Sequence, residues 1–267
     1  MHMEAIFDAR TRTLLLFVWM CLLWLLEQKL PLARSNQRKA LPNLLLMLLV
    51  LVMNFFFASL MVVSSRWTSD HRFGLFPWLG ADPWVTLIGG IILLDFWAAY
   101  LVHVLFHKFQ WLWQLHSVHH SDTMVDVTTA FRQHPGESLL RILFTVIGMF
   151  LLGLPFWVVV AYQTVSSLYA QMEHSNINLK VHPLLGNVLQ RIFVTPHNHK
   201  IHHSKLQCET DSNYGNIFVL WDRLFATYNR RTSYHDIDYG LDYLKEAEKF
   251  TFRDLLKLPY RRKDKDR

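Results

Sequence analysis

The amino-acid sequence predicts an all-α integral membrane protein, in which a bundle of transmembrane helices carries a cytosolic, histidine-rich helical cap. Hydrophobic residues make up 52% of the 267 positions and charged residues 18%, whereas ordinary soluble domains are about a quarter charged. The apolar residues are concentrated in blocks of membrane-spanning length. In addition, twelve of the fifteen histidines fall between residues 103 and 203.

The first two apolar blocks are predicted to be membrane spans. The first runs from Thr13 to Leu26 and reaches bilayer length only if its helix continues toward Pro31, with the amine of Lys29 extending to the interface. The second runs from Leu44 to Val63 and contains Asn54 as its main polar interruption.

The third and fourth blocks differ from simple spans. The third, Trp84 to Val102, contains Asp95 near its middle, and an acid at that depth usually faces protein or a cavity. The fourth, Leu139 to Met172, is interrupted by Gly153-Leu154-Pro155. One straight helix of that length would measure roughly 50 Å, too long for a bilayer core of ~30 Å. We therefore expect two helices that meet at the Gly-Leu-Pro break, entering the membrane and returning.

The basic residues predict the orientation of the chain. The linker EQKLPLARSNQRKALPN, residues 27–43, carries four basic residues and one acid, which favours the cytoplasmic side. Residues 64–83 are then outside, and everything after Val102 is cytoplasmic. This parity places the N-terminus outside, although Arg10 and Arg12 argue mildly against it. The first residues lack the pattern of a clean signal peptide.

The chain is expected to form one membrane-embedded domain in three parts. Residues 1–83 form N-terminal membrane helices, residues 84–235 a di-metal catalytic region, and residues 236–267 a basic cytosolic tail. The only cysteines, Cys21 and Cys208, exclude a disulfide framework and a thiolate metal site. The net charge of +6 fits anionic lipid head groups rather than nucleic acid.

Most of the clustered histidines follow helical spacing. His103 and His107 are separated by four residues, and two further clusters repeat the pattern H-x-x-H-H: His116, His119, His120 and His199, His202, His203. Residues one helical turn apart share a helix face, and neutral imidazole is a common ligand of transition metals. With His174 at the end of the fourth block, the set is too large for one ion, so two ions are expected.

An isolated histidine pair is more often a solvated helix face than a metal site, but the repeated pattern at one membrane face favours metal. Without metal, this many neighbouring imidazoles would be partly protonated near neutral pH and would repel one another. Thr195 and Pro196 indicate the start of the helix that carries the last cluster.

The remaining histidines are weaker candidates. His197 and His134 are out of register and are expected to lie behind the ligands or on the substrate side. Four others are expected at the surface: His2, His71, His182 and His235.

All-nitrogen ligation does not by itself distinguish iron, zinc and copper. Two zinc ions would indicate a membrane lipid hydrolase, with Glu173 or Glu137 as its base, although neither lies in a recognisable hydrolase motif. Two iron ions would activate dioxygen and oxidise an unactivated C–H bond, of which membrane lipids contain many. A non-catalytic metal-binding membrane protein is the third interpretation.

The motifs also resemble, in order and spacing, the fatty acid hydroxylase/sterol desaturase superfamily of integral membrane di-metal oxygenases. The resemblance extends from Trp84 to Tyr228 and rests on five blocks: DFWAAYLVHVLFHKFQWLWQLHSVHHSD, FRQHPGE, EHSNINL, TPHNHKIHHS and NYGNIFVLWDRLFATY. It implies an all-helical membrane domain with a cytosolic cap, a non-haem di-iron centre and O2-dependent oxidation of a lipid.

The resemblance also implies the ligand set, namely His103, His107, His116, His119, His120, His174, His199, His202 and His203. Members similar to fatty acid 2-hydroxylases carry one more histidine, a turn after the position of His174. This chain has Asn178 there. A tenth ligand position is accordingly filled by Asn178 or water, or is empty.

Several polar residues near the motifs are candidates to orient the ligands. Asp95, two turns before His103, either orients an imidazole or is satisfied inside the bundle. We expect two of five others to accept imidazole N–H bonds: Asp122, Asp211, Asn213, Asn216 and Asp222. Three aromatic residues are expected to pack within the cap: Trp221, Phe225 and Tyr228.

The sequence thus predicts an O2-dependent lipid hydroxylase, with desaturation as the competing outcome. The chain has no G-x-G-x-x-G loop, Fe–S cysteines or cytochrome module. Electrons are therefore expected from a separate ferredoxin- or cytochrome-type protein, an acidic donor docked by basic residues of the cap. Fatty acyl, sterol, carotenoid, sphingolipid and ether lipid substrates all stay open.

Overall fold

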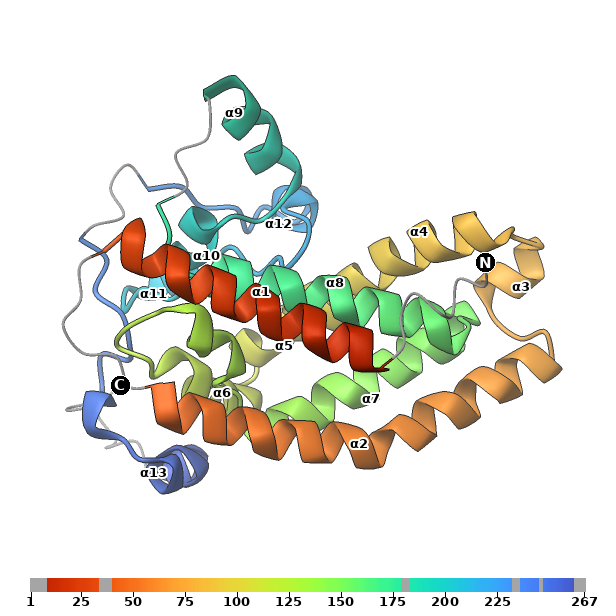
Figure 1. Ribbon diagram of the computed structural model, residues 1–267, viewed down its shortest axis with the longest axis horizontal. Helices are drawn as coiled ribbons and strands as arrows, with labels where there is room; N and C mark the ends of the chain where they lie inside the picture. The colour runs from red at the N-terminus through yellow and green to blue at the C-terminus, as the bar shows by residue number, and fades with distance from the viewer. Residues whose placement is uncertain (1–8, 34–39, 179–182, 232–235, 245–246, 262–267) are drawn as a thin grey trace.

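A computed structural model describes residues 9–33, 40–178, 183–231, 236–244 and 247–261, and within these ranges the chain forms helices and no β-strand. The long helices run side by side along the longest axis of the molecule (Figure 1). Four segments are long and apolar enough to cross a membrane: Ala9–Lys29, Ala40–Leu79, Pro83–Lys108 and Pro135–Leu152. The prediction of an all-helical integral membrane protein is confirmed, whereas the cytosolic placement of the histidine-rich end stays a prediction.

The first two spans are longer than their apolar blocks. Helix α1 (Ala9–Lys29) has 21 residues and is about 31 Å long at 1.5 Å per residue, enough to cross the bilayer core. Helix α2 (Ala40–Asp70) has 31 residues. Glu27, assigned to the linker in the sequence, instead lies buried in the last turn of α1. It accepts hydrogen bonds from the backbone N–H groups of Val127 and Asn176 at 2.8 and 2.7 Å.

The third apolar block forms one rod of three consecutive segments after the short helix α3 (Leu75–Leu79). Helix α4 (Pro83–Leu94) begins after Asp82, whose side chain accepts the N–H bonds of the first turn. A π-helical segment, η2 (Asp95–Leu101), follows, and α5 (Val102–Lys108) completes the rod. The wider turn of η2 comes directly before His103, and π-segments often occur at functional sites.

The fourth block forms two helices, as predicted: α7 (Pro135–Leu152) and α8 (Phe156–His174). Gly153 ends α7 with φ of +68°, a conformation that suits glycine because it has no Cβ. The largest apolar core lies where α4, η2, α7 and α8 meet, and its fully buried members include Leu94, Met149 and Val158. Entry of this helix pair into the membrane stays a prediction.

Shorter elements gather at one end of the bundle, at the left in Figure 1 for α6, α10, α11 and α13. Their bounds are α6 (Gln110–His120), η3 (Val127–Phe131), α9 (Pro183–Ile192), α10 (Pro196–His202), α11 (Gln207–Thr210), α12 (Leu220–Leu224), η4 (Ala247–Lys249), α13 (Phe252–Lys257) and η5 (Leu258–Tyr260). Helix α10 begins at Pro196 after Thr195, which confirms the predicted helix start.

Some sequence-based expectations lie outside the described residues. They concern the linker residues Arg34, Arg38 and Lys39 and three histidines expected at the surface, His2, His182 and His235. His71 is described and is exposed, as expected, with its ring stacked on Trp67.

Replacing Gly153 with alanine is expected to destabilise the protein strongly. The new Cβ would meet the carbonyl oxygen of Phe73 and lie 2.6 Å from Pro77 Cδ, in addition to the cost of a left-handed alanine, about 1–2 kcal/mol. Gly80→Ala is the matched control, because Gly80 has φ of +59° and no atom near the added Cβ. Thermal unfolding in mild detergent should show a much larger fall in Tm for Gly153→Ala. Equal falls would contradict the clash.

Candidate metal centre

Nine histidines from four helices meet at the end of the bundle and form two groups that could each hold a metal ion. The first group is His103, His107, His116, His120 and His202, and the second is His119, His174, His199 and His203. Within each group, one nitrogen of every ring lies within 4.8 Å of the others. The structure therefore brings together all nine histidines selected from the sequence.

The two H-x-x-H-H clusters are each divided between the groups. In α6, His116 and His120 belong to the first group and His119 to the second. In the other cluster, His199 of α10 and His203, the residue directly after α10, belong to the second group and His202 to the first. At 3.6 residues per turn, residues four apart diverge by about 40° around the helix, while the residue three along diverges by about 60° in the opposite direction. The i,i+4 pair can thus meet at one point while the middle histidine turns toward the other.

Oxygen atoms fix the tautomers of four of the five rings in the first group. His103 Nδ1 lies 2.9 Å from the carbonyl of Tyr214, His107 Nδ1 3.1 Å from Asp211 Oδ1, His116 Nδ1 3.0 Å from Glu137 Oε1 and His202 Nδ1 2.8 Å from the carbonyl of Ser212. These oxygens only accept, so each Nδ1 carries the proton and each Nε2 keeps its lone pair.

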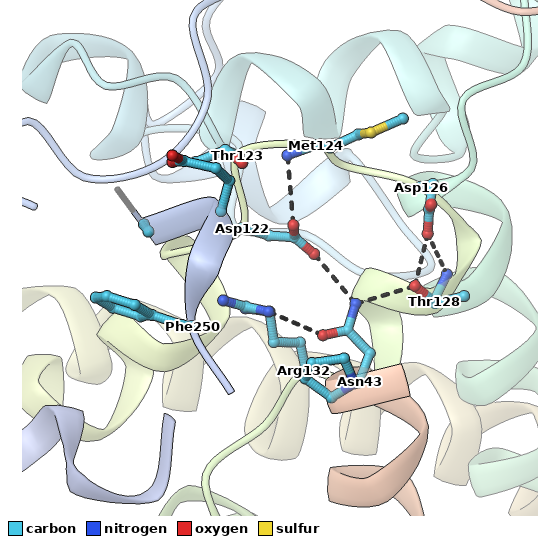
Figure 2. Close-up of a pocket in the computed structure, with 11 residues that line it drawn as sticks. Asn43, Asp122, Thr123, Met124, Asp126, Thr128, Arg132 and Phe250 are labelled. Carbon is cyan, nitrogen blue, oxygen red and sulfur yellow. Dashed lines mark hydrogen bonds between the residues drawn. The ribbon is translucent and has the colours of Figure 1, made fainter. Parts of the chain in front are cut away.

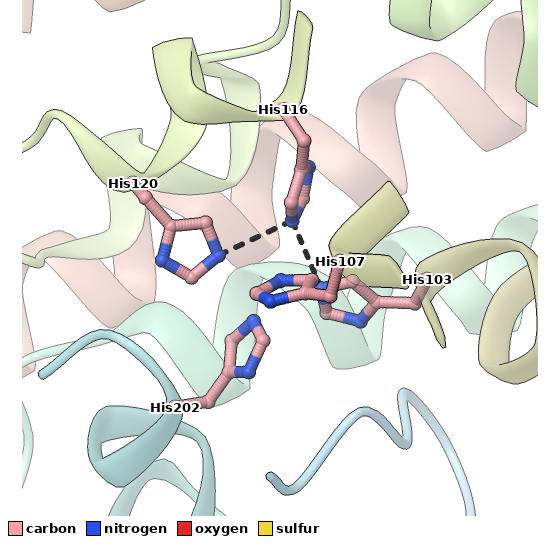
Figure 3. Close-up of side chains that lie close together, drawn as sticks. All are labelled: His103, His107, His116, His120 and His202. Carbon is pink, nitrogen blue, oxygen red and sulfur yellow. Dashed lines mark hydrogen bonds between the residues drawn. The ribbon is translucent and has the colours of Figure 1, made fainter. Parts of the chain in front are cut away.

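The lone pairs of the first group converge on one space (Figure 3). His116 Nε2 lies 3.0 Å from His103 Nε2 and 3.2 Å from His120 Nε2. Among the described residues, the buried Nε2 atoms of His107 and His202 have no hydrogen-bond partner. Lone pairs held so close together repel unless a cation lies between them, so the donor set fits a metal ion.

The loop between α11 and α12, residues 211–219, supplies three of these acceptors: the carboxylate of Asp211 and the carbonyls of Ser212 and Tyr214. Partial burial raises the pKa of Asp211, but the hydrogen bonds from His107 and Gln207 outweigh it and hold the pKa below its usual value. Of the five polar candidates selected from the sequence, Asp211 is the one whose side chain accepts a hydrogen bond from a histidine of the two groups, His107.

The same loop is held by two buried aspartates. Asp222 accepts the backbone N–H bonds of Tyr214 and Gly215, at 2.8 and 2.9 Å. Asp95 accepts the backbone N–H of Ile217 at 3.1 Å and the indole N–H of Trp221 at 2.9 Å. The hydrogen-bond donors to Asp95 are Ile217, Phe218 and Trp221 rather than a histidine. Asp95 is therefore satisfied inside the bundle, which is one of the two alternatives expected from the sequence, and it positions the loop.

Glu137 contacts the first group in a way that the sequence did not predict. It is fully buried in the first turn of α7, accepts the His116 Nδ1–H and forms an ion pair with Arg141 at 2.9 Å. The sequence singled out Glu137 as a base for a hydrolase, not as an acceptor for an imidazole. The sequence feature that could have indicated this role is an acid directly after His134-Pro135-Gly136, at the start of a mainly apolar helix.

The second group has fewer acceptors. His174 Nδ1 donates to the carbonyl of Ala170 at 2.6 Å, and its Nε2 lies 3.0 Å from His119 Nε2 and 2.9 Å from His199 Nε2. In the described part of the chain, the buried Nδ1 atoms of His119, His199 and His203 have no hydrogen-bond partner. The buried carboxylate of Glu173 lies 3.8 Å from His199 Nδ1, just beyond hydrogen-bond distance.

Burial favours the neutral form of five histidines in the two groups. It lowers the pKa of His119, His120, His199, His202 and His203 well below the usual value, and neighbouring imidazoles lower it further. The expectation of partial protonation near neutral pH was wrong for these five, because burial penalises the protonated form of each ring and the neighbouring imidazoles add to that penalty. Neutral imidazole is the form that binds metal.

Two buried cations hold the histidine helices in place. Lys200, between two histidines of α10, donates from Nζ to the carbonyls of Val125 and His174 at 2.7 and 3.3 Å; burial lowers its pKa to about 8. Arg132 donates to Asn43 Oδ1 on α2 at 3.0 Å (Figure 2). It also donates to the carbonyl of Val118 in the last turn of α6 at 3.0 Å. A cation at a helix C-terminus is electrostatically favourable.

The other polar candidates lie around the groups without touching them. Asp122 accepts from Asn43 (Figure 2) and from Thr129, Asn216 donates to Ser166, and Asn213 pairs with the backbone of Asn229. Two of the five candidates were expected to accept imidazole N–H bonds, and Asp211 alone has such a bond. Asp222 instead accepts the backbone N–H groups of Tyr214 and Gly215.

Three more residues lie outside both groups. The backbone N–H of Asn178 donates to the carbonyl of Leu30, and His134 caps the start of α7 by accepting from Gly136 N–H. His197 is a half-buried residue of α10. Of the aromatic residues expected to pack, Trp221 is buried, Tyr228 half-buried and Phe225 exposed.

A bundle of apolar helices that ends in two groups of buried histidines defines an integral membrane protein with a candidate dinuclear metal centre. The sequence profile described as "Fatty acid hydroxylase" matches residues 87–227, a range that contains all nine histidines. The match covers more than half of the chain, and the chain belongs to the fatty acid hydroxylase family.

Curated relatives carry lipid-oxidising names. An ornithine lipid hydroxylase of Rhizobium tropici is 32% identical over 152 residues, 57% of this chain and 44% of the relative. The human alkylglycerol monooxygenase is 27% identical over 222 residues, 82% of this chain and 46% of the relative. This chain thus spans less than half the length of these relatives. No solved structure shows a significant match.

Replacing Asp95 with alanine is expected to loosen the loop that holds the first group. The change leaves the N–H groups of Ile217, Phe218 and Trp221 buried without their acceptor, at a cost of about 1–3 kcal/mol per group. We expect a lower Tm and faster proteolysis within residues 211–222. Asp70→Ala, at the exposed end of α2, is the control. Unchanged proteolysis of the loop in Asp95→Ala would contradict this role.

Proposed function

We propose that this protein is a membrane-bound, O2-dependent di-iron oxidoreductase that hydroxylates a C–H bond of a lipid, with desaturation as the alternative outcome. One observation carries the proposal: nine buried histidines form two adjacent groups with their ring nitrogens converging. Membership in the fatty acid hydroxylase family supports the lipid chemistry.

The two groups would each hold one iron ion, His103, His107, His116, His120 and His202 the first and His119, His174, His199 and His203 the second. All-nitrogen ligation does not by itself distinguish iron from zinc, and membership in the fatty acid hydroxylase family supports iron. Reduced iron would supply dioxygen activation and hydrogen abstraction.

The protein residues have three tasks around such a centre. Asp211, Glu137 and the carbonyls of Ser212 and Tyr214 orient the imidazoles and keep the proton of each ring on Nδ1. Burial of the rings excludes water, which would otherwise consume a reactive oxidant. Because Arg141 pairs with Glu137, the carboxylate stays balanced by a nearby positive charge.

The substrate and the electron donor belong to the same proposal. The named relatives support a membrane lipid as substrate. We place the histidine-rich end on the cytoplasmic side, where a separate ferredoxin- or cytochrome-type protein would deliver electrons to a basic docking surface. A tenth ligand would be water or Asn178, whose half-buried side chain lies four residues after His174.

Metal analysis of purified protein tests the centre. We expect two iron ions per chain and O2 uptake on reduction. His202→Ala should empty the first group and His199→Ala the second, so each variant should retain about one ion and lose turnover. His71→Ala, at an exposed residue in the turn after α2, should change neither the iron content nor the turnover. Zinc alone, with lipid hydrolysis and no O2 uptake, would contradict the proposal, as would full iron and activity in both variants.

Lipid profiling tests the reaction. Membranes from cells that express the wild-type protein, compared with cells that express His202→Ala, should contain a lipid that has gained one oxygen atom. A lipid that has lost two hydrogen atoms would instead identify a desaturase. Identical lipid profiles in both cell lines, with electrons and O2 supplied, would count against any lipid oxidation by this chain.

A further inference from the structure

An apolar cavity of about 220 Å³ lies beside the first histidine group. Its lining residues are all apolar and come from α5, the turn after it, α6 and α7: Val102, Leu105, Phe106, Phe109, Trp111, Leu112, Leu140 and Phe144. Two of its walls therefore belong to the membrane-spanning segments Pro83–Lys108 and Pro135–Leu152. In a bilayer, these two segments would place the cavity beside lipid.

The inner wall of the cavity is in direct contact with the candidate metal centre. Phe106 is 1% exposed, and its ring is stacked on the imidazole of His116 with centroids 5.4 Å apart and planes 18° apart. The Arg141 guanidinium lies 5.1 Å from the Phe106 ring centroid and is paired with Glu137, the acceptor for His116. A single aromatic ring thus separates the cavity from the first group.

The outer rim carries two exposed aromatic residues. Phe109 is 50% exposed and Trp111 is 60% exposed, at the corner between α5 and α6. Tryptophan is enriched at the membrane–water interface, so this corner fits the head-group level. A chain that enters here passes from the interface toward Phe106.

We propose that this cavity binds one alkyl or acyl chain of a membrane lipid, and that Phe106 sets which carbon of the chain approaches the first histidine group. The assignment rests on the proposed lipid oxidation and narrows its substrate class. The only polar side-chain group among the lining residues is the indole N–H of Trp111 at the rim, and the cavity volume is below the ~300–1,000 Å³ of pockets for drug-sized ligands. It suits a single chain better than a fused sterol ring system.

Photo-crosslinking tests the binding site without any need for turnover. A phospholipid with a diazirine in its acyl chain is added to the purified full chain in mild detergent, and labelled peptides are identified by mass spectrometry. We expect labelling of residues 102–112 and 140–144 that excess straight-chain lipid suppresses and excess sterol does not. Equal or stronger suppression by sterol would overturn the assignment to a single chain.

A pair of tryptophan variants on α7 locates the site. Leu140→Trp fills the cavity and should reduce the suppressible labelling by about tenfold, the scale on which hydrophobic pockets discriminate by size. Leu143→Trp is the matched control, since Leu143 is 38% exposed and does not line the cavity, and its labelling should match the wild type. Equal labelling in both variants, at wild-type iron content, would overturn the site.

The role of Phe106 has its own readout. Phe106→Leu removes the ring that separates the cavity from His116, and we expect normal iron content with the new oxygen or double bond at a different chain position. Fragmentation mass spectrometry of the product gives that position, and an unchanged position would contradict the role of Phe106. Crosslinking as expected without any lipid oxidation would leave the cavity in place and instead refute the proposed function.

Discussion

Nine imidazoles buried together are stabilised where ring N–H groups meet acceptors and where the opposite nitrogens can share a cation. Most of the rings in the first group find such acceptors in oxygen atoms that are distant in sequence, above all those of the loop at residues 211–219. That loop in turn depends on the carboxylates of Asp222 and Asp95. The site thus extends from the histidines to two aspartates that touch none of them.

The two groups differ in how far they are organised. Four rings of the first group have Nδ1 acceptors, whereas three rings of the second have buried Nδ1 atoms without a partner in the described part of the chain. Glu173 lies 3.8 Å from a ring nitrogen of His174 and of His199 in the second group, farther than the 3.0 Å that separates Glu137 from His116 in the first. A buried carboxylate beside each group balances the charge that a metal ion would bring.

The membrane-spanning helices also bring the centre next to the lipid phase. Helices α5 and α7 contribute both to the histidine group and its carboxylate and to the apolar cavity behind Phe106. Because one ring separates the cavity from His116, a substrate chain would reach the centre without crossing water. The proposed lipid oxidation would therefore take place at the end of the membrane bundle, beside the candidate metal centre.

The sequence by itself determined the helical membrane class, the break at Gly153 and the nine histidines, because apolar block length, Gly-Leu-Pro and i,i+4 spacing are local properties. It did not determine how the H-x-x-H-H clusters divide, because that depends on how α6 and α10 face each other. Nor did it reveal that Glu137 accepts from His116 while Asp95 holds a loop more than a hundred residues away. Acceptors for buried N–H groups are chosen by packing, so only the tertiary structure decided them.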